Sequence, residues 1–396
     1  MRDTRQYTAF AVTAPGVAPF AARELEALGL SPNEPEAGGV AFSADARGLY
    51  VANLQLRTAN RVLVRVDEFR ASNFHELERR TARLPWNEWI APGREVALRV
   101  TCRKSRLYHS GAVSERVAAA LAGVTGQGGV SGAPRDDDAD GDGEAQLVVV
   151  RLLNDRCTIS LDASGALLHQ RGYRLAVGKA PLRETLGAAL LLAAPWDPSL
   201  PLVDPFCGSG TLAIEGAMIA RRLAPGRHRR FAFEQWPAFD PELWHGVRGD
   251  AARRELPTAP SPIVASDRDA GAIDAAEANA QRAGVAGDIT FVRHAVSSAA
   301  PPEGVPGPGW VITNPPYGQR VGITGELRDL YARFGAVLRE RFPGWHVGVL
   351  STERRLTAQL GTTLTPALLT SNGGLPVTLA VGTVASASAA PRGAGK

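Results

Sequence analysis

The chain has 396 residues, of which 44% are hydrophobic, so it is too long for one ordinary domain and can bury two or three cores. Its net charge of +4 permits a polyanionic partner, although a solvated basic surface would give the same balance. The three cysteines are scattered and form no C-x-x-C pair, so they indicate neither a disulfide framework nor a zinc site. The polar N-terminus and the absence of a long apolar run exclude a signal peptide and a membrane span, and we expect a cytoplasmic protein.

The first 70 residues are expected to form a small α+β segment. Alternating apolar positions indicate strands, and apolar positions at helical spacing indicate the helices between them. The expected strands cover 7–14, 39–42 and 59–69, and the expected helices cover 17–28 and 47–56.

Residues 71–165 are expected to form a second α+β unit. Its expected helices cover 74–83 and 111–122, and its expected strands cover 95–102, 146–153 and 157–162. Residues 123–145 are rich in glycine and contain three consecutive aspartates at 136–138, which predicts a flexible insertion rather than a metal-binding loop.

Two short stretches combine cations with aromatic rings, a composition that suits contact with the backbone and bases of RNA. The first, residues 103–109, follows a predicted strand, and its candidate residues are Arg103, Lys104, Arg106 and His109. The second follows an Asp-x-Ser-Gly turn, and its candidate residues are Arg171, Tyr173 and Arg174. For the first stretch, an ordinary exposed loop is the alternative interpretation.

Residues 201–217 combine a short apolar strand, a glycine turn and the start of a helix, which indicates a cofactor cradle. Asp204 stands where the strand meets the crevice at its carboxyl end, with a plain turn residue as the alternative. Gly208 and Gly210 allow a tight turn and a close approach of the backbone to a ligand. Thr211 is expected to cap the helix that follows.

The same glycines also satisfy the loose dinucleotide-binding pattern G-x-G-x-x-G/A. That fold places a ribose-binding acid roughly 20 residues further on, at the end of the next strand. Here the next predicted strand, 263–266, comes far later, which argues against a dinucleotide-dependent oxidoreductase.

Two later strands also end in polar residues. Strand 263–266 ends at Asp267, which is expected to bind ribose hydroxyls, with the N-cap of helix 270–283 as the alternative. Strand 289–292 is followed by His294, for which a solvent-exposed loop residue is the alternative to a cofactor contact.

The strand 310–313 ends in Asn314-Pro315-Pro316-Tyr317. An exocyclic amino group of a base is a poor nucleophile because its lone pair is delocalised into the ring, and two acceptors aimed at its hydrogens favour a more pyramidal nitrogen. The side-chain carbonyl of Asn314 and the main-chain carbonyl of Pro315 are the candidate acceptors, and Pro316 helps to stiffen the chain. Tyr317 is expected to stack on a base taken out of its helix or loop. A rigid turn is the alternative.

The remaining C-terminal elements complete an α/β pattern. A helix is expected at 326–342, and strands are expected at 347–350, 364–369 and 375–384, the last two joined by a hairpin turn at 372–374. The tail from 385 to 396 is of low complexity and is expected to be disordered.

The order of strand and glycine turn, strand and acid, then strand and Asn-Pro-Pro-Tyr resembles class I S-adenosylmethionine-dependent methyltransferases that modify exocyclic amino groups of bases. The whole chain resembles the bacterial guanine-N2 RNA methyltransferases that join a THUMP domain to a Rossmann-like catalytic domain, with a close match to the group acting on 23S ribosomal RNA. Four stretches carry the resemblance, namely 161–174, 180–192, 203–217 and 313–322.

The resemblance implies S-adenosylmethionine as cofactor, RNA as partner and N2-methylguanosine as product. The implied domains are a ferredoxin-like segment at 1–70, a THUMP domain at 71–165 and a Rossmann-like methyltransferase domain at 166–384. The implied catalytic residues are Asn314, Pro315, Pro316 and Tyr317. The implied cofactor-binding residues are Asp204, Pro205, Phe206, Gly208, Gly210, Thr211, Asp267, Arg268, His294 and Asn314. His294 departs from the family pattern, which usually has an acid near the adenine.

Other functions stay open at this point. Related enzymes with the same layout methylate guanosine in the tRNA acceptor stem. An RNA-binding or assembly factor without turnover is a second alternative, suggested by His294, although the intact Asn314–Tyr317 sequence argues against it. DNA adenine methyltransferases also use Asn-Pro-Pro-Tyr, but the THUMP-like N-terminal half favours RNA.

Overall fold

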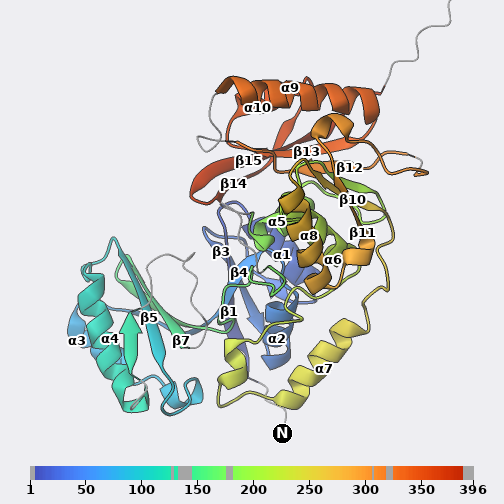
Figure 1. Ribbon diagram of the computed structural model, residues 1–396. Coiled ribbons are helices and arrows are strands. Elements are labelled where there is room, and N and C mark those ends of the chain that lie inside the picture. The colour runs from blue at the N-terminus through green and yellow to red at the C-terminus, as the bar shows by residue number, and fades with distance from the viewer. Residues whose placement is uncertain are drawn as a thin grey trace, which may run out of the picture. The chain divides into compact units, whose positions relative to one another are not determined.

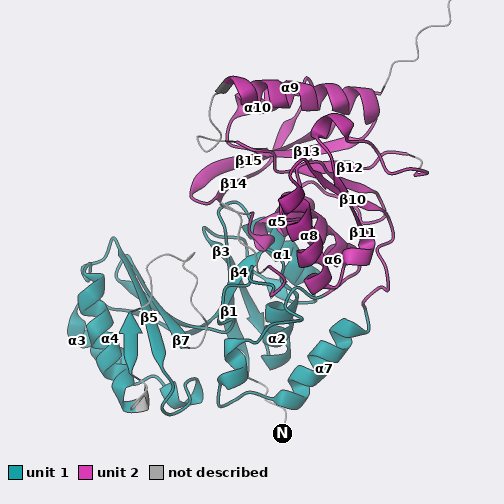
Figure 2. Cartoon of the chain, viewed as in Figure 1, with its two compact units in different colours: residues 1–171, 224–254 teal, residues 172–223, 255–396 magenta. Residues whose placement is uncertain are grey.

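The structure is a computed structural model that describes residues 5–125, 129–132, 145–174, 182–305, 307–317 and 324–386 (Figure 1). The chain forms two compact units, which Figure 2 colours separately. Unit 1 comprises Met1–Arg171 and Ala224–Arg254, and unit 2 comprises Gly172–Leu223 and Glu255–Lys396. None of the helices within the described ranges has both the length and the apolar character that crossing a bilayer requires.

Unit 1 is built on an eight-stranded mixed sheet with the strand order β2-β3-β1-β4-β8-β7-β5-β6. The strands are β1 (Tyr7–Thr13), β2 (Ser31–Pro32), β3 (Gly39–Ala44), β4 (Ala59–Arg70), β5 (Val96–Arg103), β6 (Val130–Gly132), β7 (Gln146–Leu153) and β8 (Arg156–Asp162). The long strand β4 pairs with β1 on one side and with β8 on the other. One continuous sheet therefore runs through both of the N-terminal segments that the sequence predicts.

One face of this sheet and the helices of unit 1 share a single hydrophobic core, to which alternate strand residues such as Val62, Val64, Val148 and Val150 contribute. The helices are α1 (Ala18–Ala27), α2 (Ala46–Gln55), α3 (Phe74–Thr81), α4 (Ser110–Thr125) and α7 (Pro241–Ala252), with short 3-10 turns at Trp86–Glu88 and Ala232–Gln235. The alternation of buried and exposed positions along the strands is what a sheet covered on one face requires.

The expected flexible insertion at 123–145 is partly wrong. Helix α4 continues to Thr125, and Val130–Gly132 form the edge strand β6, which pairs in parallel with β5. A sequence pattern of three residues is too short to indicate a strand, because a strand of that length depends on its neighbour for its hydrogen bonds. Residues 126–128 and 133–144 of the insertion, and 387–396 of the tail, lie outside the described residues.

The segment Ala224–Arg254 belongs to unit 1, although it lies within the range 166–384 that the sequence assigns to the methyltransferase domain. Its aromatic side chains join the core of unit 1, where the ring of Phe233 stacks on Tyr50 at a centroid distance of 4.4 Å. Trp244 packs edge-on against the same tyrosine at 5.9 Å. Aromatic burial therefore explains how this long connection folds.

Unit 2 contains a seven-stranded sheet with the order β11-β10-β9-β12-β13-β15-β14. Its strands are β9 (Leu202–Asp204), β10 (Ile263–Asp267), β11 (Ile289–Arg293), β12 (Trp310–Thr313), β13 (His346–Ser351), β14 (Thr365–Asn372) and β15 (Leu375–Thr383). The five strands from β9 to β13 are parallel, and β15 is antiparallel to β13. The chain order reverses between β9 and β12, which makes this pair the switch point where ligands bind in doubly wound sheets.

Helices pack on both faces of this second sheet. They are α5 (Glu184–Ala193), α6 (Thr211–Ala220), α8 (Ala270–Ala283), α9 (Thr324–Arg341) and α10 (Arg354–Ala358), with 3-10 turns at Ala286–Asp288 and Val296–Ser298. Val203 shares a core with Phe334 of α9, whereas its neighbour Leu202 faces α6 at Gly216. The predicted Rossmann-like α/β class is confirmed.

Candidate active site

The polar residues predicted for the site stand at one edge of the second sheet. Asp204 ends β9, Asp267 ends β10, His294 follows β11 and Asn314 follows β12. Because these four strands are parallel neighbours, their carboxyl ends meet at the same edge. The structure therefore brings together residues that are as much as 110 positions apart in the chain.

Asp204 is buried, with 1% of its surface exposed, at the switch point of the sheet. Its Oδ1 accepts a hydrogen bond of 2.6 Å from the hydroxyl of Thr313 on β12 and one of 3.2 Å from the backbone amide of Phe206. Burial raises the pKa of Asp204 to about 7, and the nearby charge of Asp267 raises the pKa further. The two hydrogen bonds act in the opposite direction and lower the pKa. Asp204 is therefore only partly ionised near neutral pH, and a positive group beside it would favour the ionised form.

The glycine turn after β9 needs its two glycines for different reasons. Gly210 has φ +86°, and a Cβ there would lie 3.0 Å from the Cβ of Ala276, so it permits close contact between α6 and α8. Gly208 has φ +51°, and a Cβ there would meet no atom within 4 Å. Its amide donates a hydrogen bond of 3.0 Å to Oδ2 of Asp267. The turn is therefore tied to the end of β10 and has open space beside Gly208.

The predicted cap of α6 is wrong, and Asp267 does not have the alternative role of capping α8. Helix α6 begins after Gly210, whose left-handed backbone starts it without any side-chain cap, and the hydroxyl of Thr211 instead accepts a hydrogen bond from Arg174. Helix α8 is capped by Asp269, which accepts from the amides of residues 271 and 272, so Asp267 is free of that role. The carboxylate of Asp267 accepts the backbone amides of Gly208 and Asp269.

The remaining cofactor candidates differ in exposure. Pro205 is buried, and the ring of Phe206 packs edge-on against Phe334 at 5.4 Å, so both support the turn from behind. Arg268 is exposed beside Asp267. His294 is partly exposed, and its backbone amide donates to the carbonyl of Asp267 at 3.0 Å, which links the ends of β11 and β10.

Asn314 directly follows β12, beside Asp204. Its side-chain Oδ1 is buried and has no hydrogen-bond partner among the described residues. Buried carbonyl oxygens in folded proteins nearly always have a donor, so an acceptor held in this way is suited to a donor that comes from a ligand.

The residues after Asn314 form hydrogen bonds with α9 and with the β14–β15 hairpin. Pro315 is buried, and the carbonyl of Pro316 accepts a long hydrogen bond of 3.5 Å from the hydroxyl of Tyr331 on α9. The hydroxyl of Tyr317 accepts a hydrogen bond of 2.9 Å from Nδ2 of Asn372, at the tip of the β14–β15 hairpin. Residues 318–323, which complete this loop, lie outside the described residues.

The first predicted RNA-binding stretch is exposed. Arg103, Lys104, Arg106 and His109 all face solvent, and Tyr108 between them is 81% exposed. Nδ1 of His109 accepts the amide of Ala112 at 3.1 Å in the first turn of α4. Exposed cations around an exposed ring remain compatible with RNA contact.

The second predicted RNA-binding stretch points inward, which argues against RNA contact there. Arg171 and Tyr173 are each 2% exposed. Arg171 donates to the carbonyls of Leu168 and Arg57, and the hydroxyl of Tyr173 lies 3.1 Å from a carboxylate oxygen of Glu215. Arg174 forms an ion pair of 3.5 Å with Glu184. A turn signal followed by cations does not indicate whether the cations point outward.

Three residues that support the site were not predicted from the sequence. Thr313 bonds Asp204, Asn372 bonds Tyr317, and Asn279 of α8 is fully buried and donates through Nδ2 to the carbonyl of Ser209 at 3.0 Å. A buried asparagine in an alanine-rich helix is the signal that could have identified Asn279, because a buried amide needs a partner.

These residues fit S-adenosylmethionine. The open space beside Gly208 leaves room for a ligand against the backbone, and the buried carboxyl of Asp204 is suited to a positively charged amino group. Asn314, just after the neighbouring strand, adds an acceptor that has no partner among the described residues.

Comparison with known families matches three parts of the chain. Residues 8–63 match the RlmL ferredoxin-like domain, residues 71–162 match the THUMP domain, and residues 171–379 match the RMKL-like methyltransferase domain. The last match alone covers more than half of the chain.

Individual proteins give the same result. The chain is 37% identical over 387 residues to slr0064 of Synechocystis sp., provisionally named an RNA methyltransferase, covering 96% of this chain and 98% of that one. It is 35% identical over 372 residues to the ribosomal RNA large subunit methyltransferase K/L of Vibrio campbellii, covering 92% of this chain but only 52% of that protein. The chain therefore spans about half the length of the K/L relative.

A solved structure covers nearly the whole chain. The crystal structure of SMU.472 complexed with S-adenosylhomocysteine superposes with a TM-score of 0.83 at 28% identity, covering 97% of this chain and 99% of that one. S-Adenosylhomocysteine is what remains of S-adenosylmethionine after methyl transfer. The chain belongs to the RMKL-like family of S-adenosylmethionine-dependent RNA methyltransferases, with a ferredoxin-like and a THUMP domain ahead of the catalytic one.

Proposed function

We propose that this protein transfers a methyl group from S-adenosylmethionine to the exocyclic N2 of a guanosine in 23S ribosomal RNA. A ribosomal RNA substrate places the reaction in the cytoplasm. The observation that carries the proposal is the buried Oδ1 of Asn314, an acceptor without a described partner beside the proposed cofactor cradle.

Asn314 and Pro315 are the groups that act on the amine. Bound S-adenosylmethionine supplies an electrophilic methyl group on a sulfonium centre. The side-chain carbonyl of Asn314 accepts a hydrogen bond from one N–H of the exocyclic amine, and the main-chain carbonyl of Pro315 accepts a hydrogen bond from the other. Both acceptors favour a pyramidal nitrogen, and their value lies in being in place before the reaction.

Tyr317 and Pro316 position the base. The ring of Tyr317 stacks on the extruded guanine, and the bond to Asn372 fixes the ring in the orientation that stacking needs. Tyr331 supports the carbonyl of Pro316 from α9. Asn314 is thus followed by a segment that is fixed at two points, which suits a residue that must aim its oxygen at an atom of the substrate.

The cofactor lies along the carboxyl ends of β9, β10 and β11 in this proposal. Asp204 and the amides near Gly208 and Gly210 bind the methionine end, with Thr211 at the start of α6 close by. Asp267 and Arg268 bind near the ribose, and His294 lies near the adenine. Pro205 and Phe206 support the turn rather than react.

The choice of substrate depends on the relatives. The K/L relative is named as a large-subunit ribosomal RNA methyltransferase, and this favours ribosomal RNA over tRNA. Guanine N2 follows from the family that the four sequence stretches resemble. A tRNA acceptor stem is the second candidate, because enzymes of the same layout methylate guanosine there.

Methyl transfer from labelled S-adenosylmethionine tests the substrate. Protein-free 23S ribosomal RNA and bulk tRNA, both from a strain that lacks this protein, are incubated separately with the full chain, and the labelled nucleosides are then analysed. Label as N2-methylguanosine in ribosomal RNA alone is the expected result, and label in tRNA alone would move the function to the second candidate. No label in either RNA, with S-adenosylmethionine still bound, would point to a substrate formed during ribosome assembly or to an assembly factor without turnover.

A further inference from the structure

A hollow of about 480 Å³ lies in unit 2 where β13 ends. It is lined by the end of β13 and the residues after it, by α10 and by β15, and among the lining residues are Ser351, Thr352, Glu353, Arg354, Thr357 and Thr378. None of the described residues that the proposed function assigns to the cofactor or to the amine lines this hollow. Its volume is in the range of sites that hold one small ligand.

The hollow begins beside the segment that carries Asn314. Strands β12 and β13 are parallel neighbours in register, so both end at the same edge of the sheet. The hydroxyl of Tyr331 on α9 connects the two strand ends, because it donates to the carbonyl of Pro316 at 3.5 Å and also forms a hydrogen bond with Ser351. The hollow thus adjoins the position proposed for the exocyclic amine.

Glu353 has a fixed backbone and an unpaired carboxylate. The hydroxyl of Ser351 accepts the backbone amide of Glu353 at 3.2 Å and donates to its carbonyl at 3.3 Å. Glu353 occupies the N-cap position of α10, but its side chain makes no capping hydrogen bond. The side chain is exposed and forms no hydrogen bond or ion pair with any other residue that the structure describes. This acceptor is therefore available to a ligand.

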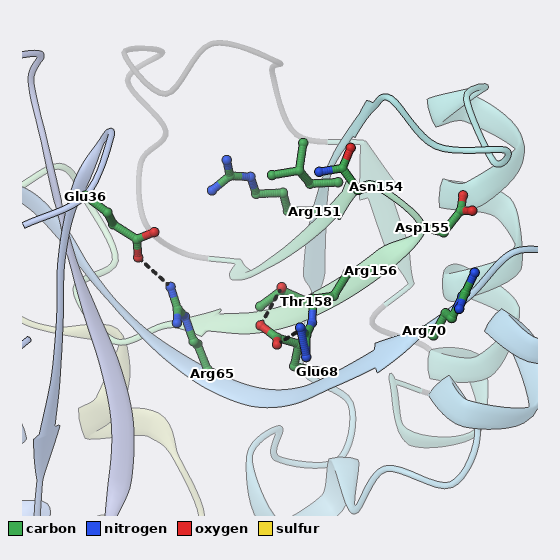
Figure 3. Close-up of a pocket in the computed structure, with 10 residues that line it drawn as sticks. Glu36, Arg65, Glu68, Arg70, Arg151, Asn154, Asp155, Arg156 and Thr158 are labelled. Atoms are coloured by element: carbon green, nitrogen blue, oxygen red, sulfur yellow. Dashed lines mark hydrogen bonds and ion pairs between the residues drawn. The ribbon is translucent and has the colours of Figure 1, made fainter.

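Acids that line the hollow of about 690 Å³ in unit 1 show the contrast (Figure 3). There Glu36 pairs with Arg65 at 3.2 Å and Glu68 pairs with Arg156 at 2.6 Å, as the dashed lines mark. These carboxylates already have cationic partners within their own unit. Glu353 has none among the described residues, and this distinguishes the hollow of unit 2.

The carboxylate of Glu353 lies near the groups that hold the base in the proposed function. Burial raises the pKa of the Tyr331 hydroxyl, and the charges of Tyr317 and Glu353 raise that pKa further. Charges act on one another in this way only over short separations, because solvent and salt screen distant ones. Glu353, Tyr317 and the carbonyl of Pro316 are therefore grouped around one phenol.

The acceptors of Asn314 and Pro315 do not by themselves distinguish guanine from adenine. The exocyclic amine of either base presents two N–H donors to them. The ring atom next to the amine differs, because N1 of guanine carries a hydrogen and donates, whereas N1 of adenine accepts. A carboxylate beside the amine site would attract the first and repel the second, and leaving a buried polar group of the wrong base unpaired adds to the discrimination.

We propose that Glu353 determines the specificity for guanine by accepting a hydrogen bond from N1–H of the extruded base while Asn314 and Pro315 accept its amine. The inference rests on the proposed function and adds to it the residue that identifies the base. Tyr317 then supplies stacking without selectivity, since every base has a π-face. The hollow beyond Glu353 leaves room for the O6 edge of the ring.

The test compares a guanosine and an adenosine at one position. The labelled guanosine in the product of the wild-type chain is mapped, and transcripts carrying either nucleoside at that position are methylated by the full chain in single turnover. Glu353→Ala removes the acceptor, and Glu353→Gln keeps an uncharged acceptor while adding an N–H donor that suits N1 of adenine. The control is Glu340→Gln, the same change at an exposed position near the C-terminal end of α9.

Glu353→Ala is expected to lower kcat/KM for the guanosine transcript by about 10-fold to 100-fold, as the loss of a charge-assisted hydrogen bond implies. Glu353→Gln should lose less, and its preference for guanosine over adenosine should fall by at least about 10-fold. The Tm and the affinity for S-adenosylmethionine should stay unchanged in both variants, because Glu353 is exposed.

The inference is overturned if both variants behave as the control does, or if the rates fall while the preference for guanosine stays that of the wild-type chain. The second result would assign Glu353 a structural role. Whether the wild-type chain forms N2-methylguanosine at all tests the proposed function separately, so either can fail without the same result. N6-methyladenosine as the wild-type product would overturn both.

Discussion

We predict that Asp204 makes cofactor binding dependent on pH. Its pKa of about 7 means that the carboxyl is protonated in more acidic solution and ionised in more basic solution. If the ionised form binds the amino group of S-adenosylmethionine, affinity should rise between about pH 6 and pH 8, by at most about 10-fold per pH unit. Calorimetric titration of the cofactor at several pH values measures this. Asp204→Asn should bind more weakly with no such slope, and equal affinity of the wild-type chain at both ends of the range would contradict the assignment.

The same carboxyl affects folding in the opposite direction. Because burial raises the pKa above its unfolded value of about 3.8, the native state keeps a proton that the unfolded state releases as the pH rises. The stability that this proton contributes is present below the ordinary pKa and is lost as the pH rises through about 7. Asp204→Asn should therefore raise the Tm of the cofactor-free chain at about pH 8 more than at about pH 5. A larger gain at the acid end would show that the carboxyl is not buried as a neutral group.

Asn372 is a positioning residue for Tyr317 in this account, acting through one hydrogen bond of 2.9 Å. Asn372→Ala and Tyr317→Phe each remove that bond, and each should lower kcat/KM for RNA by about 5-fold, which corresponds to about 1 kcal/mol, while cofactor affinity stays unchanged. The double variant should be no worse than either single variant, because both remove the same interaction. Additive losses in this cycle would mean that Asn372 acts elsewhere.

The glycine turn between β9 and α6 allows a matched comparison. Gly208 and Gly210 both have positive φ, so alanine strains the backbone at either position, but only at Gly210 does the new Cβ press against α8 at Ala276. Gly210→Ala should therefore destabilise the full chain by about 1–2 kcal/mol more than Gly208→Ala, as measured by urea unfolding. Equal losses would indicate that α6 and α8 can separate without cost.

Elements with a strong periodic pattern were predictable, and their local details were not. The four strand ends that carry Asp204, Asp267, His294 and Asn314 follow from buried apolar runs that stop at a polar residue. The start of α6 was not predictable, because Gly210 begins this helix through its left-handed backbone and no side chain caps it. The bulge in β4 was not predictable either, since one inserted residue leaves the composition of the strand unchanged.

The direction of a side chain depends on contacts between distant segments. Arg171 and Arg174 have the composition of an RNA-binding stretch, yet they bond to carbonyls and carboxylates inside the protein. The acceptor of Arg171 on Arg57 lies 114 residues away in the chain. No local pattern encodes a partner at that distance, and for this reason the sequence does not show that these two arginines point inward.

The two units differ in the side chains that they present. Unit 1 has a sheet with charged side chains around a hollow on one face. Unit 2 has a switch point with a buried carboxyl and an acceptor that has no partner among the described residues. The chain crosses between the two units more than once. After β9 the segment Ala224–Arg254 returns to the core of unit 1, and the chain then re-enters unit 2 before β10. The sequence predicts the domain types from residue patterns, but a return of this kind depends on aromatic packing that only the folded chain reveals.

The central claim is that Asn314 aims an acceptor at the exocyclic amine of guanine. The measurement that tests it most directly compares single-turnover methyl transfer into 23S ribosomal RNA by the wild-type chain and Asn314→Ala, with analysis of the labelled nucleoside and of cofactor affinity. We predict N2-methylguanosine from the wild-type chain, a rate about 100-fold to 1000-fold lower for the variant, and nearly unchanged affinity for S-adenosylmethionine. A near-normal rate in the variant, or N6-methyladenosine as the product, would contradict the account.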